Sequence, residues 1–393
     1  MNWPQASIRD VAPPERAAVS FNDDQEVWSL SLDQIESQTG RILGKQRVRA
    51  GDAGTSTFPF DTEHVLYSKL RPYLNKVVRP DEPGLATTEL VPLRPNCGLI
   101  DAGFLTFYLR SYSFVQFATN MVAGAKMPRM VMDKFWEHQL PLPPLSEQRR
   151  IVELLEQADA LRRRRADADS LGTRIVPALF RKMFGEPIRN ANGWPTENLL
   201  RICSPRQWPT ISSRELLESG FPVYGANGRI GFYDSFNHEK ATVLITCRGA
   251  SCGTINVCEP KSYVTGNAMS LDDPDESKIT NEFLEWFLRV RGLSDTITGA
   301  AQPQITRANL AVVEVLTPPK PLVDTFTDKA RAVRRVETEQ AASGTNIETL
   351  FQTMLYRAFT GELTAGWREA HMKELLSEME QQARHLNTSR VAA

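Results

Sequence analysis

The chain has 393 residues, enough for two or three domains that each bury a core. It carries 46 Lys and Arg against 47 Asp and Glu, and this balance excludes a histone-like polycation but allows a local basic face. No apolar run approaches the roughly 18 residues of a membrane span, and the first residues lack a signal-peptide pattern. Five irregularly spaced cysteines argue against a disulfide framework, so we expect a cytoplasmic protein.

Comparison of the chain with itself reveals an ordered series of matches about 175 residues apart. Gly124 pairs with Gly299 and Pro128 with Pro303. Such a series predicts a tandem duplication with a pseudo-two-fold repeat. The matched segments are VLYSKLRPYLNKVV at 65–78 with VLITCRGASCGTINV at 243–257, ATTELVPL at 86–93 with VTGNAMSL at 264–271, FLTFYLR at 104–110 with FLEWFLR at 283–289, AGAKMPRM at 123–130 with GAAQPQI at 299–305, PLPP at 141–144 with TPP at 317–319, and LFRKMFGE at 179–186 with LFQTMLYRAFTGE at 350–362.

The first repeat is expected to begin with a strand-rich domain over 1–140 that carries one amphipathic helix around 101–119. A helical segment follows over 141–186. It starts after two prolines at Ser146, and Pro177 should start or kink its second half. The apolar positions with helical spacing are Ile151, Leu154, Leu155, Ala158 and Leu161 in 146–166, then Leu171, Ile175, Leu179 and Met183.

The second repeat is predicted to follow the same plan. A strand-rich domain covers 187–316, with a turn between strands in YGANGRIGFYD at 224–234 and a helix around 279–294. A helical segment covers 317–364, and a tail over 365–393 can form an amphipathic helix without a counterpart in the first repeat. The periodic apolar positions are Leu322, Phe326, Ala330, Val333 and Val336 in 320–341, then Ile347, Leu350, Met354 and Ala358.

Helices of this length extend about 30 Å, and two matching apolar seams favour an antiparallel coiled coil. The predicted fold class is therefore α+β, with two tandem strand-rich domains joined by two long helices. The alternative is that each helix packs on its own domain as an ordinary core helix.

Signatures of catalysis are missing from the sequence. There is no phosphate-binding GxxxxGK[ST] loop, no GxSxG elbow and no HExxH pair, and GANGRIG has the wrong spacing for a dinucleotide site. Cys247, Cys252 and Cys258 lack zinc-ligand spacing, so buried thiols explain them better. These features favour a non-catalytic binding protein without a metal.

Cationic and amide side chains gather instead in the turn-rich segments of both repeats. Such side chains bind base edges and phosphates, although singly each is more often a solvated surface residue. Because the positions recur, we expect DNA contacts from these loops. The candidates are Lys69, Arg71, Tyr73, Asn75, Lys76, Lys126 and Arg129 in the first repeat, and Asn227, Arg229, Tyr233, Arg248, Ser251, Gln302, Gln304 and Arg307 in the second. The arginine run 162–165 is interpreted as a solvated helix face or a partner-binding surface rather than a DNA contact.

These motifs resemble the specificity (S) subunit of Type I restriction–modification systems over nearly the whole chain. YSKLRPYLNKV with ATTELVPLRP is similar to that family's first target recognition domain, and YGANGRIGFYD, RGASCGTI and VTGNAMSL are similar to a divergent second one. LPPLSEQRRIVELLEQADAL with LFRKMFGE is similar to its central conserved helices. The second copy, PPKPLVDTFTDKA, departs from this pattern because it lacks the Glu-Gln pair.

The resemblance implies a DNA-specificity subunit in which each recognition domain reads half of a bipartite, asymmetric site and the helices set the gap. It implies two methyltransferase subunits and two endonuclease/translocase subunits as partners on double-stranded DNA, with no membrane. S-adenosylmethionine would belong to the methyltransferase, and ATP and Mg to the endonuclease, in a phage-defence system. The residues expected to bind a partner are Glu147, Gln148, Arg149, Ile151 and Leu155.

Other interpretations of the same residues remain open. The chain could serve a modification-only or other phage-defence system without an endonuclease. It could also be a coiled-coil scaffold that binds only protein, or an enzyme whose site has no recognisable motif.

Overall fold

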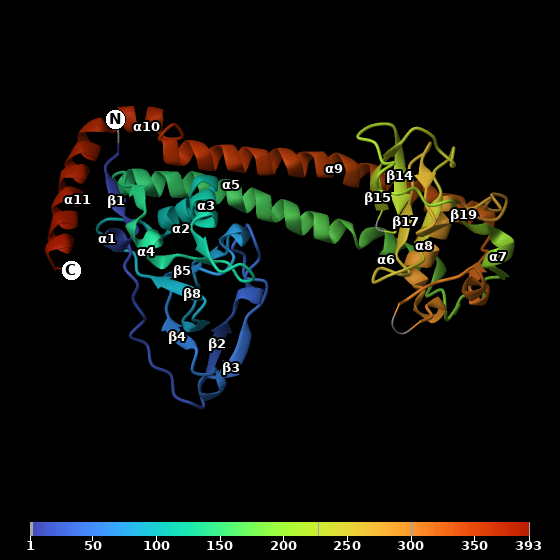
Figure 1. The fold of residues 1–393 in the computed structure, drawn as a ribbon, viewed down its shortest axis with the longest axis horizontal. Helices are drawn as coiled ribbons and strands as arrows, with labels where there is room; N and C mark the ends of the chain where they lie inside the picture. The colour runs from blue at the N-terminus through green and yellow to red at the C-terminus, as the bar shows by residue number, and fades with distance from the viewer. Residues whose placement is uncertain (1–2, 227, 300–301, 393) are drawn as a thin grey trace. The chain divides into compact units, whose positions relative to one another are not determined.

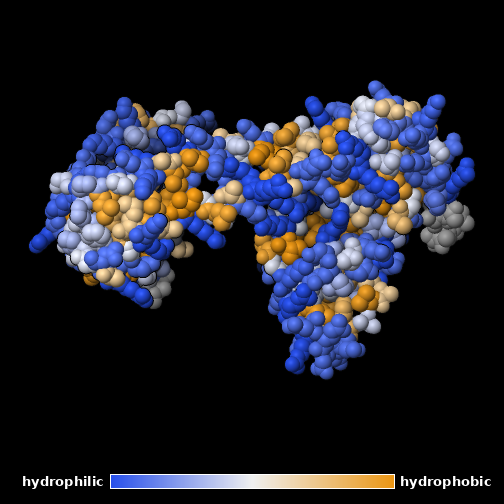
Figure 2. Space-filling view, turned by 180° about the vertical axis from the view of Figure 1, so that it is seen from behind, coloured by the Kyte–Doolittle hydropathy of each residue, from blue (hydrophilic) through white to orange (hydrophobic). Residues whose placement is uncertain are grey.

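The computed structural model describes residues 3–226, 228–299 and 302–392, and it divides into two compact units (Figure 1). Unit 1 contains Met1–Arg164 and Gly344–Ala393, and unit 2 contains Arg165–Ser343. Both predicted helical segments, 141–186 and 317–364, are therefore shared between units, and the finer domain boundaries stay predictions. The face seen in Figure 2 is mostly hydrophilic and carries several apolar patches.

Small sheets form the strand-rich part of unit 1, with orders β3-β2-β7-β4, β6-β5-β8, β10-β9 and β1-β11. Trp28 and Phe60 pack edge to face in the first sheet, with ring centroids 5.3 Å apart. The strands are β1 (Gln5–Ser7), β2 (Glu26–Leu30), β3 (Gln46–Arg49), β4 (Thr57–Phe60), β5 (Val65–Ser68), β6 (Val77–Val78), β7 (Gly84–Thr87), β8 (Leu90–Leu93), β9 (Val122–Ala123), β10 (Arg129–Met130) and β11 (Gln139–Pro141).

Unit 2 has sheets of order β13-β19-β16-β17, β15-β14-β18 and β12-β20. The turn predicted around Gly225 and Gly228 is confirmed, because these glycines face each other at the end of the β14–β15 hairpin. The strands are β12 (Thr196–Asn198), β13 (Ser204–Gln207), β14 (Phe221–Gly225), β15 (Gly228–Tyr233), β16 (Val243–Thr246), β17 (Ile255–Val257), β18 (Tyr263–Val264), β19 (Ala268–Asp272) and β20 (Glu314–Leu316).

Short helices cover the sheets and begin at polar caps. The helix expected around 101–119 is two helices, because the Ser111 hydroxyl accepts the N–H of Phe114 and starts a new one. The helix expected around 279–294 is α8, capped by the Thr280 hydroxyl. The short helices are α1 (Ile8–Val11), α2 (Ala102–Arg110), α3 (Tyr112–Asn120), α4 (Met132–Glu137), α6 (Ile175–Phe184), α7 (Leu199–Ile202), α8 (Asn281–Arg291) and α10 (Ala365–Ala370).

The long helices are α5 (Leu145–Gly172), α9 (Lys320–Thr360) and α11 (Met372–Ala392). The prediction that Pro177 starts a second helix is confirmed, since Pro177 lies in the first turn of α6, where its missing N–H costs little. The second repeat has Glu348 in place of this proline, and α9 is continuous.

The two helices that join the units run antiparallel, as predicted. Within unit 1, Glu147 near the start of α5 binds Thr364 just beyond α9, and Arg162 lies 3.5 Å from Glu348. The alternative arrangement, in which the long helices pack on the domain cores, is also observed, because each helix packs on the core of a unit. Ile151 and Leu155 join Phe351 and Leu355 in the core of unit 1, whereas Val323, Phe326 and Ala330 of α9 pack with Phe180 of α6 in unit 2. Leu161 and Val336, at the ends of the predicted seams, are exposed.

The sequence comparison overlooked one further match between the repeats. Trp-Pro occurs at positions 3–4 and again at positions 194–195, and each pair precedes an equivalent strand. β1 pairs with β11 in unit 1, and β12 pairs with β20 in unit 2, both antiparallel. In unit 2 the chain continues from α6 into Trp194, whose indole donates to the Phe184 carbonyl. In unit 1 the corresponding helix end is the distant C-terminal end of α9.

A buried carboxylate connects the two ends of the chain within unit 1. Glu147 is fully buried, and its oxygens accept hydrogen bonds from Trp3 Nε1 at 3.0 Å, Thr364 Oγ1 at 2.7 Å and Arg368 Nε at 2.8 Å. The Arg368 guanidinium also lies 4.9 Å from the Trp3 ring centroid. In Figure 1, α11 lies beside β1 and α1.

Replacement of Glu147 by Ala should lower the free energy of unfolding of unit 1 by about 3–5 kcal/mol, because Arg368 would keep a buried charge without its carboxylate. Urea denaturation measures this loss, and faster hydrogen exchange over 365–387 should report release of the tail. The matched control is Arg149→Ala on the same turn, which is exposed and should change stability by less than about 0.5 kcal/mol. An unchanged urea midpoint for Glu147→Ala would contradict the proposed role of this carboxylate.

Candidate nucleic-acid interface

The structure brings together the two polar segments predicted in the first repeat. The N–H of Arg71 donates to the Pro128 carbonyl at 2.7 Å, and the N–H of Met130 donates to the Lys69 carbonyl at 2.8 Å. The loop after β5 and the β9–β10 hairpin are therefore neighbours. They carry Lys69, Arg71, Lys126 and Arg129.

Unit 2 repeats these backbone bonds at equivalent positions. The N–H of Gly249 donates to the Pro303 carbonyl at 3.1 Å, and the N–H of Ile305 donates to the Cys247 carbonyl at 3.0 Å. The loop that carries Arg248 thus lies against the segment that carries Gln302 and Gln304. The duplication inferred from sequence is therefore preserved at the level of individual hydrogen bonds.

The candidate side chains of unit 1 fall into two groups. Arg71, Tyr73 and Lys126 are exposed and can reach a ligand. Asn75 is buried and donates through Nδ2 to the Arg110 carbonyl, and Lys76 donates through Nζ to the Leu32 carbonyl at 2.6 Å. Burial lowers the pKa of Lys76. Both residues hold the fold in this conformation, and their contact with DNA stays a prediction.

Arg129 is oriented by an ion pair with Glu89, which lies in the turn between β7 and β8. Its guanidinium donates to Glu89 from Nε at 3.1 Å and from Nη2 at 2.7 Å. This hydrogen bonding lowers the pKa of Glu89 and raises that of Arg129. A bidentate pair of this kind fixes the direction of the guanidinium plane.

The candidates of unit 2 are mostly exposed. Arg229, Arg248, Gln302, Gln304 and Arg307 are exposed, whereas Tyr233 and Ser251 are half-buried. The Tyr233 ring packs edge to face on Tyr263 at 5.5 Å. Asn227 lies outside the described residues.

The turn before Arg229 lies beside the strand that leads to Arg248. The Thr246 hydroxyl, at the end of β16, donates to the Ala226 carbonyl. The Arg229 guanidinium lies 5.5 Å from the Phe232 ring centroid. Unit 2 thus brings three chain segments together at this end of its sheets.

Four of the five residues expected to bind a partner are interior residues of unit 1. Glu147, Gln148, Ile151 and Leu155 are fully buried, and only Arg149 is exposed. Gln148 donates through Nε2 to the carbonyls of Leu99 and Pro143. These side chains position α5, so partner binding through them stays a prediction.

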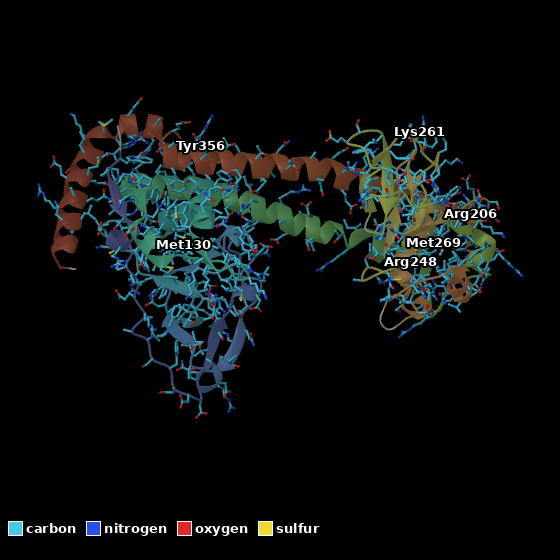
Figure 3. The ribbon with its side chains drawn as sticks, viewed as in Figure 1. Met130, Arg206, Arg248, Lys261, Met269 and Tyr356 are labelled. Carbon is cyan, nitrogen blue, oxygen red and sulfur yellow. The ribbon has the colours of Figure 1, made fainter. Side chains whose placement is uncertain are left out.

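Sequence reasoning missed polar residues on other elements. Arg47 and Arg49 lie on the edge strand β3, and the alternation in KQRVR at 45–49 was the available signal. Arg206 and Lys261 in unit 2 are visible in Figure 3, and Arg206 lies 3.3 Å from Asp273. Arg162, expected on a solvated face, keeps only 11% of its side chain exposed because it binds Asp159 at 2.6 Å.

Sites of other kinds were sought among the described residues. No group of three or more His, Cys, Asp or Glu side chains in the described ranges could hold a metal ion. The five cysteines form no disulfide. Within the described part of the chain, no helix is both long and apolar enough to cross a membrane.

Comparison with known proteins identifies the family. Residues 55–167 and 193–322 match the Type I restriction modification DNA specificity domain, once in each repeat. The chain belongs to this specificity family. The suspected relationship and the predicted fold class are thereby confirmed, and the two matched segments contain most of the polar loops described above.

Individual relatives support the assignment of the chain to this family. The Type I restriction enzyme EcoDI specificity subunit of Escherichia coli is 29% identical over 180 residues, which span 46% of this chain and 38% of that subunit. The S subunit of a Type I restriction-modification system from M. genitalium has the same fold, with a TM-score of 0.60, 16% identity, and coverage of 91% of this chain and 96% of that one. A chain from a study of complex assembly and conformational transition of the type I R-M system gives a TM-score of 0.57 at 21% identity, over 92% of this chain and 98% of that one.

Replacement of Gly299 by Ala should weaken the backbone hydrogen bonds of the segment of unit 2 that carries Gln302 and Gln304. Gly299 has φ +86°, and an added Cβ would lie 2.6 Å from the Gln302 carbonyl oxygen. Faster amide exchange at Gln304 and Ile305 would report the loss of their backbone bonds. Gly44→Ala is the control, because nothing lies within 4 Å of its added Cβ and its φ is not positive. Unchanged exchange in Gly299→Ala would show that this backbone conformation is not required.

Proposed function

We propose that this chain supplies the DNA specificity of a Type I restriction–modification complex. Each unit reads one half of an asymmetric, bipartite DNA site. The observation that supports this proposal best is the pair of loops that meet through equivalent backbone bonds in both units. In this proposal the chain recognises the DNA sequence, and its partner subunits catalyse the reactions.

The side chains on these matched backbones favour two different half-sites. Arg71 of unit 1 corresponds to Gly249 of unit 2, and Glu89 corresponds to Asn267. Arg and amide side chains recognise different base edges in the major groove. A common scaffold with different side chains suits two readers with different targets.

The long helices suit a spacer that fixes the gap between half-sites. α5 starts in unit 1 and enters unit 2, and α9 makes the return connection. Their central segments, around 163–171 and 337–346, are mostly exposed. Exposed helical surface of this kind leaves room for partner subunits.

The partners in this proposal are two methyltransferase subunits, which would use S-adenosylmethionine, and two endonuclease subunits, which would use ATP and Mg. The complex would act in the cytoplasm on double-stranded DNA. With a net charge of −1, the chain by itself offers few phosphate contacts, so the partners are expected to share DNA clamping. A salt dependence of DNA binding that stays unchanged when partners are added would contradict this sharing.

The proposal is tested by co-expressing the chain with the methyltransferase gene beside it in a host without adenine methylation. Sequencing with single-molecule detection of N6-methyladenine should reveal one bipartite motif. Its two halves should be separated by a spacer of fixed length and unspecified sequence. No new motif from an assembled complex would favour a protein-only scaffold. Turnover on DNA by the purified chain alone would favour an unrecognised enzyme, and restriction without methylation would indicate another defence system.

Substitutions in the polar loops should alter one half-site at a time. Arg71→Ala and Lys126→Ala should relax the half read by unit 1, and Arg248→Ala and Gln302→Ala the half read by unit 2. Each lost base contact should cost about 1–3 kcal/mol of discrimination. Methylation mapping of each variant measures this effect, and a change in both halves from one substitution would contradict separate reading.

Lengthening both helices should widen the gap and leave both half-sites intact. Four residues inserted in the exposed part of α5 and four in the exposed part of α9 add about 6 Å of helix. This length corresponds to about two base pairs of DNA. The control is an insertion of four residues after Ser20, in an exposed loop of unit 1, which should leave the gap unchanged. An unchanged gap in the lengthened protein would refute the spacer role.

A further inference from the structure

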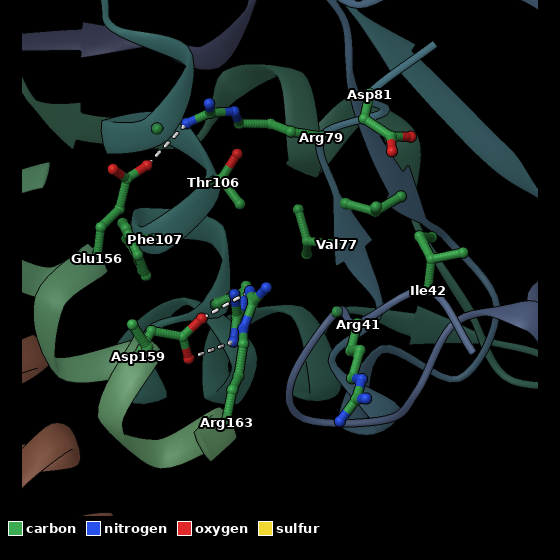
Figure 4. Close-up of a pocket in the computed structure, with 15 residues that line it drawn as sticks. Arg41, Ile42, Val77, Arg79, Asp81, Thr106, Phe107, Glu156, Asp159 and Arg163 are labelled. Atoms are coloured by element: carbon green, nitrogen blue, oxygen red, sulfur yellow. Dashed lines mark hydrogen bonds and ion pairs between the residues drawn. The ribbon is translucent and has the colours of Figure 1, made fainter. Parts of the chain in front are cut away.

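Unit 1 contains a cavity of about 540 Å³ between α2, α5, the β6 strand and the segment around Arg41 (Figure 4). We call it the arginine pocket, because Arg41, Arg79, Arg110 and Arg163 line it. The carboxylates among its lining residues are Asp81, Glu156 and Asp159. None of the candidate base-reading residues lines this pocket, although Asn75 donates to the carbonyl of Arg110.

Most carboxylates of the arginine pocket are already bound. Asp81 accepts from Lys45 at 2.9 Å, and Glu156 lies 3.4 Å from Arg79. Asp159, which is buried, binds both Arg162 and Arg163 at 2.6 Å. Little negative charge therefore remains for Arg110.

Arg110 is a buried cation with incomplete compensation. Only 7% of the residue is exposed, and its guanidinium lies 3.9 Å from Asp159, too far for a hydrogen bond. Its Nη2 makes one long hydrogen bond of 3.4 Å to the Gln38 carbonyl. Among the described residues, none accepts a hydrogen bond from its Nε. Burial lowers the pKa of Arg110 to about 10, and the charges of Arg162 and Arg163 contribute.

The second repeat carries its carboxylate on α8 rather than on the long helix, because Arg334 of α9 stands where α5 has Asp159. Arg289 of α8 corresponds to Arg110 and donates through Nε to Glu285 at 3.0 Å. Glu285 is buried and also binds Arg334 of α9. The residue of unit 1 that corresponds to Glu285 is Thr106, which lines the arginine pocket and donates its hydroxyl to the Ala102 carbonyl. One repeat is thus neutralised internally, and the other leaves a guanidinium facing a cavity.

We propose that the arginine pocket binds a phosphate group between buried Arg110 and half-exposed Arg163. A buried guanidinium whose Nε has no acceptor is stabilised most by a multiply charged oxyanion, because charge-assisted hydrogen bonds replace those lost from water. The phosphate comes either from a small soluble phosphate compound or from the backbone of bound DNA. The second source rests on the proposed function, and the first does not.

The first arm of the test uses inorganic pyrophosphate, titrated into the full chain by calorimetry in about 50 mM NaCl. Thr106→Glu, which places a carboxylate at the position that matches Glu285, should weaken binding at least about tenfold because it supplies a hydrogen-bonding carboxylate to Arg110. Arg163→Gln, at a half-exposed position where misfolding is not expected, should weaken it several-fold. The matched control is Arg16→Gln, an exposed arginine of unit 1 outside the pocket, which should leave binding unchanged.

The second arm measures DNA binding by the full chain assembled with its methyltransferase subunits. If the pocket takes a backbone phosphate, Thr106→Glu and Arg163→Gln should each reduce the slope of log affinity against log salt by about one. Arg16→Gln should leave this slope unchanged, and the methylated motif should stay the same in all three variants.

The outcomes separate the two sources. Pyrophosphate binding that is weakened by both pocket variants supports a soluble phosphate, and a shallower salt slope without pyrophosphate binding supports the DNA backbone. Equal behaviour of wild type and Arg163→Gln in both arms overturns the proposal, whether or not Thr106→Glu folds. If the assembled complex binds no DNA, the proposed function fails. The pyrophosphate arm alone then tests whether the pocket binds phosphate.

Discussion

The burial of one carboxylate determines how unit 1 is assembled. Glu147 loses its hydration inside the protein, and such a charge is tolerated only when it is paired and hydrogen-bonded. Its partners, Trp3, Thr364 and Arg368, come from opposite ends of the chain. Other polar groups support the same junction. Gln382 of α11 donates to the Leu99 and Pro143 carbonyls that Gln148 also binds, and Glu378 accepts from the first-turn N–H of Ser146. The start of α5 is therefore the point where both termini are fixed.

The matching start of α9 packs in unit 2 without a buried charge. Leu322 and Val323 of α9 stand where α5 has Glu147 and Gln148, and both pack with the apolar core. In unit 2 the chain runs directly from α6 through Trp194 into β12, so covalent continuity brings these elements together. Unit 1 must gather separate segments, and directional hydrogen bonds to a single carboxylate select one arrangement of them. The missing Glu-Gln pair in the second repeat thus has a structural explanation.

In the polar loops, too, the two repeats keep the same backbone hydrogen bonds and differ in their side chains. The bonds between Arg71 and Pro128 and between Gly249 and Pro303 hold two similar loops, while the side chains on these loops differ in charge and size. In the arginine pocket, Thr106 stands where unit 2 has Glu285 and Asp159 stands where it has Arg334, and Arg110 is left without a hydrogen-bonded carboxylate. Duplication followed by side-chain exchange can create new ligand preferences on a frame whose stability comes from backbone bonds and apolar packing.

The sequence by itself determined the duplication, the strand-rich and helical segments, the helix start after Pro143 and Pro144, and the helix start at Pro177. These features depend on local composition, periodicity and backbone restriction, which act within a few turns of the chain. Only the tertiary structure decided which surface covers each apolar seam, since periodicity shows that a face is buried without showing its partner. Glu147 and Asn75, expected at binding surfaces, are buried, and Lys76 is half-buried. These positions, and the hydrogen bond of Lys76 to the Leu32 carbonyl, depend on segments far away in sequence. Contacts of that range arise from packing of the whole unit, because no local pattern in the sequence encodes them.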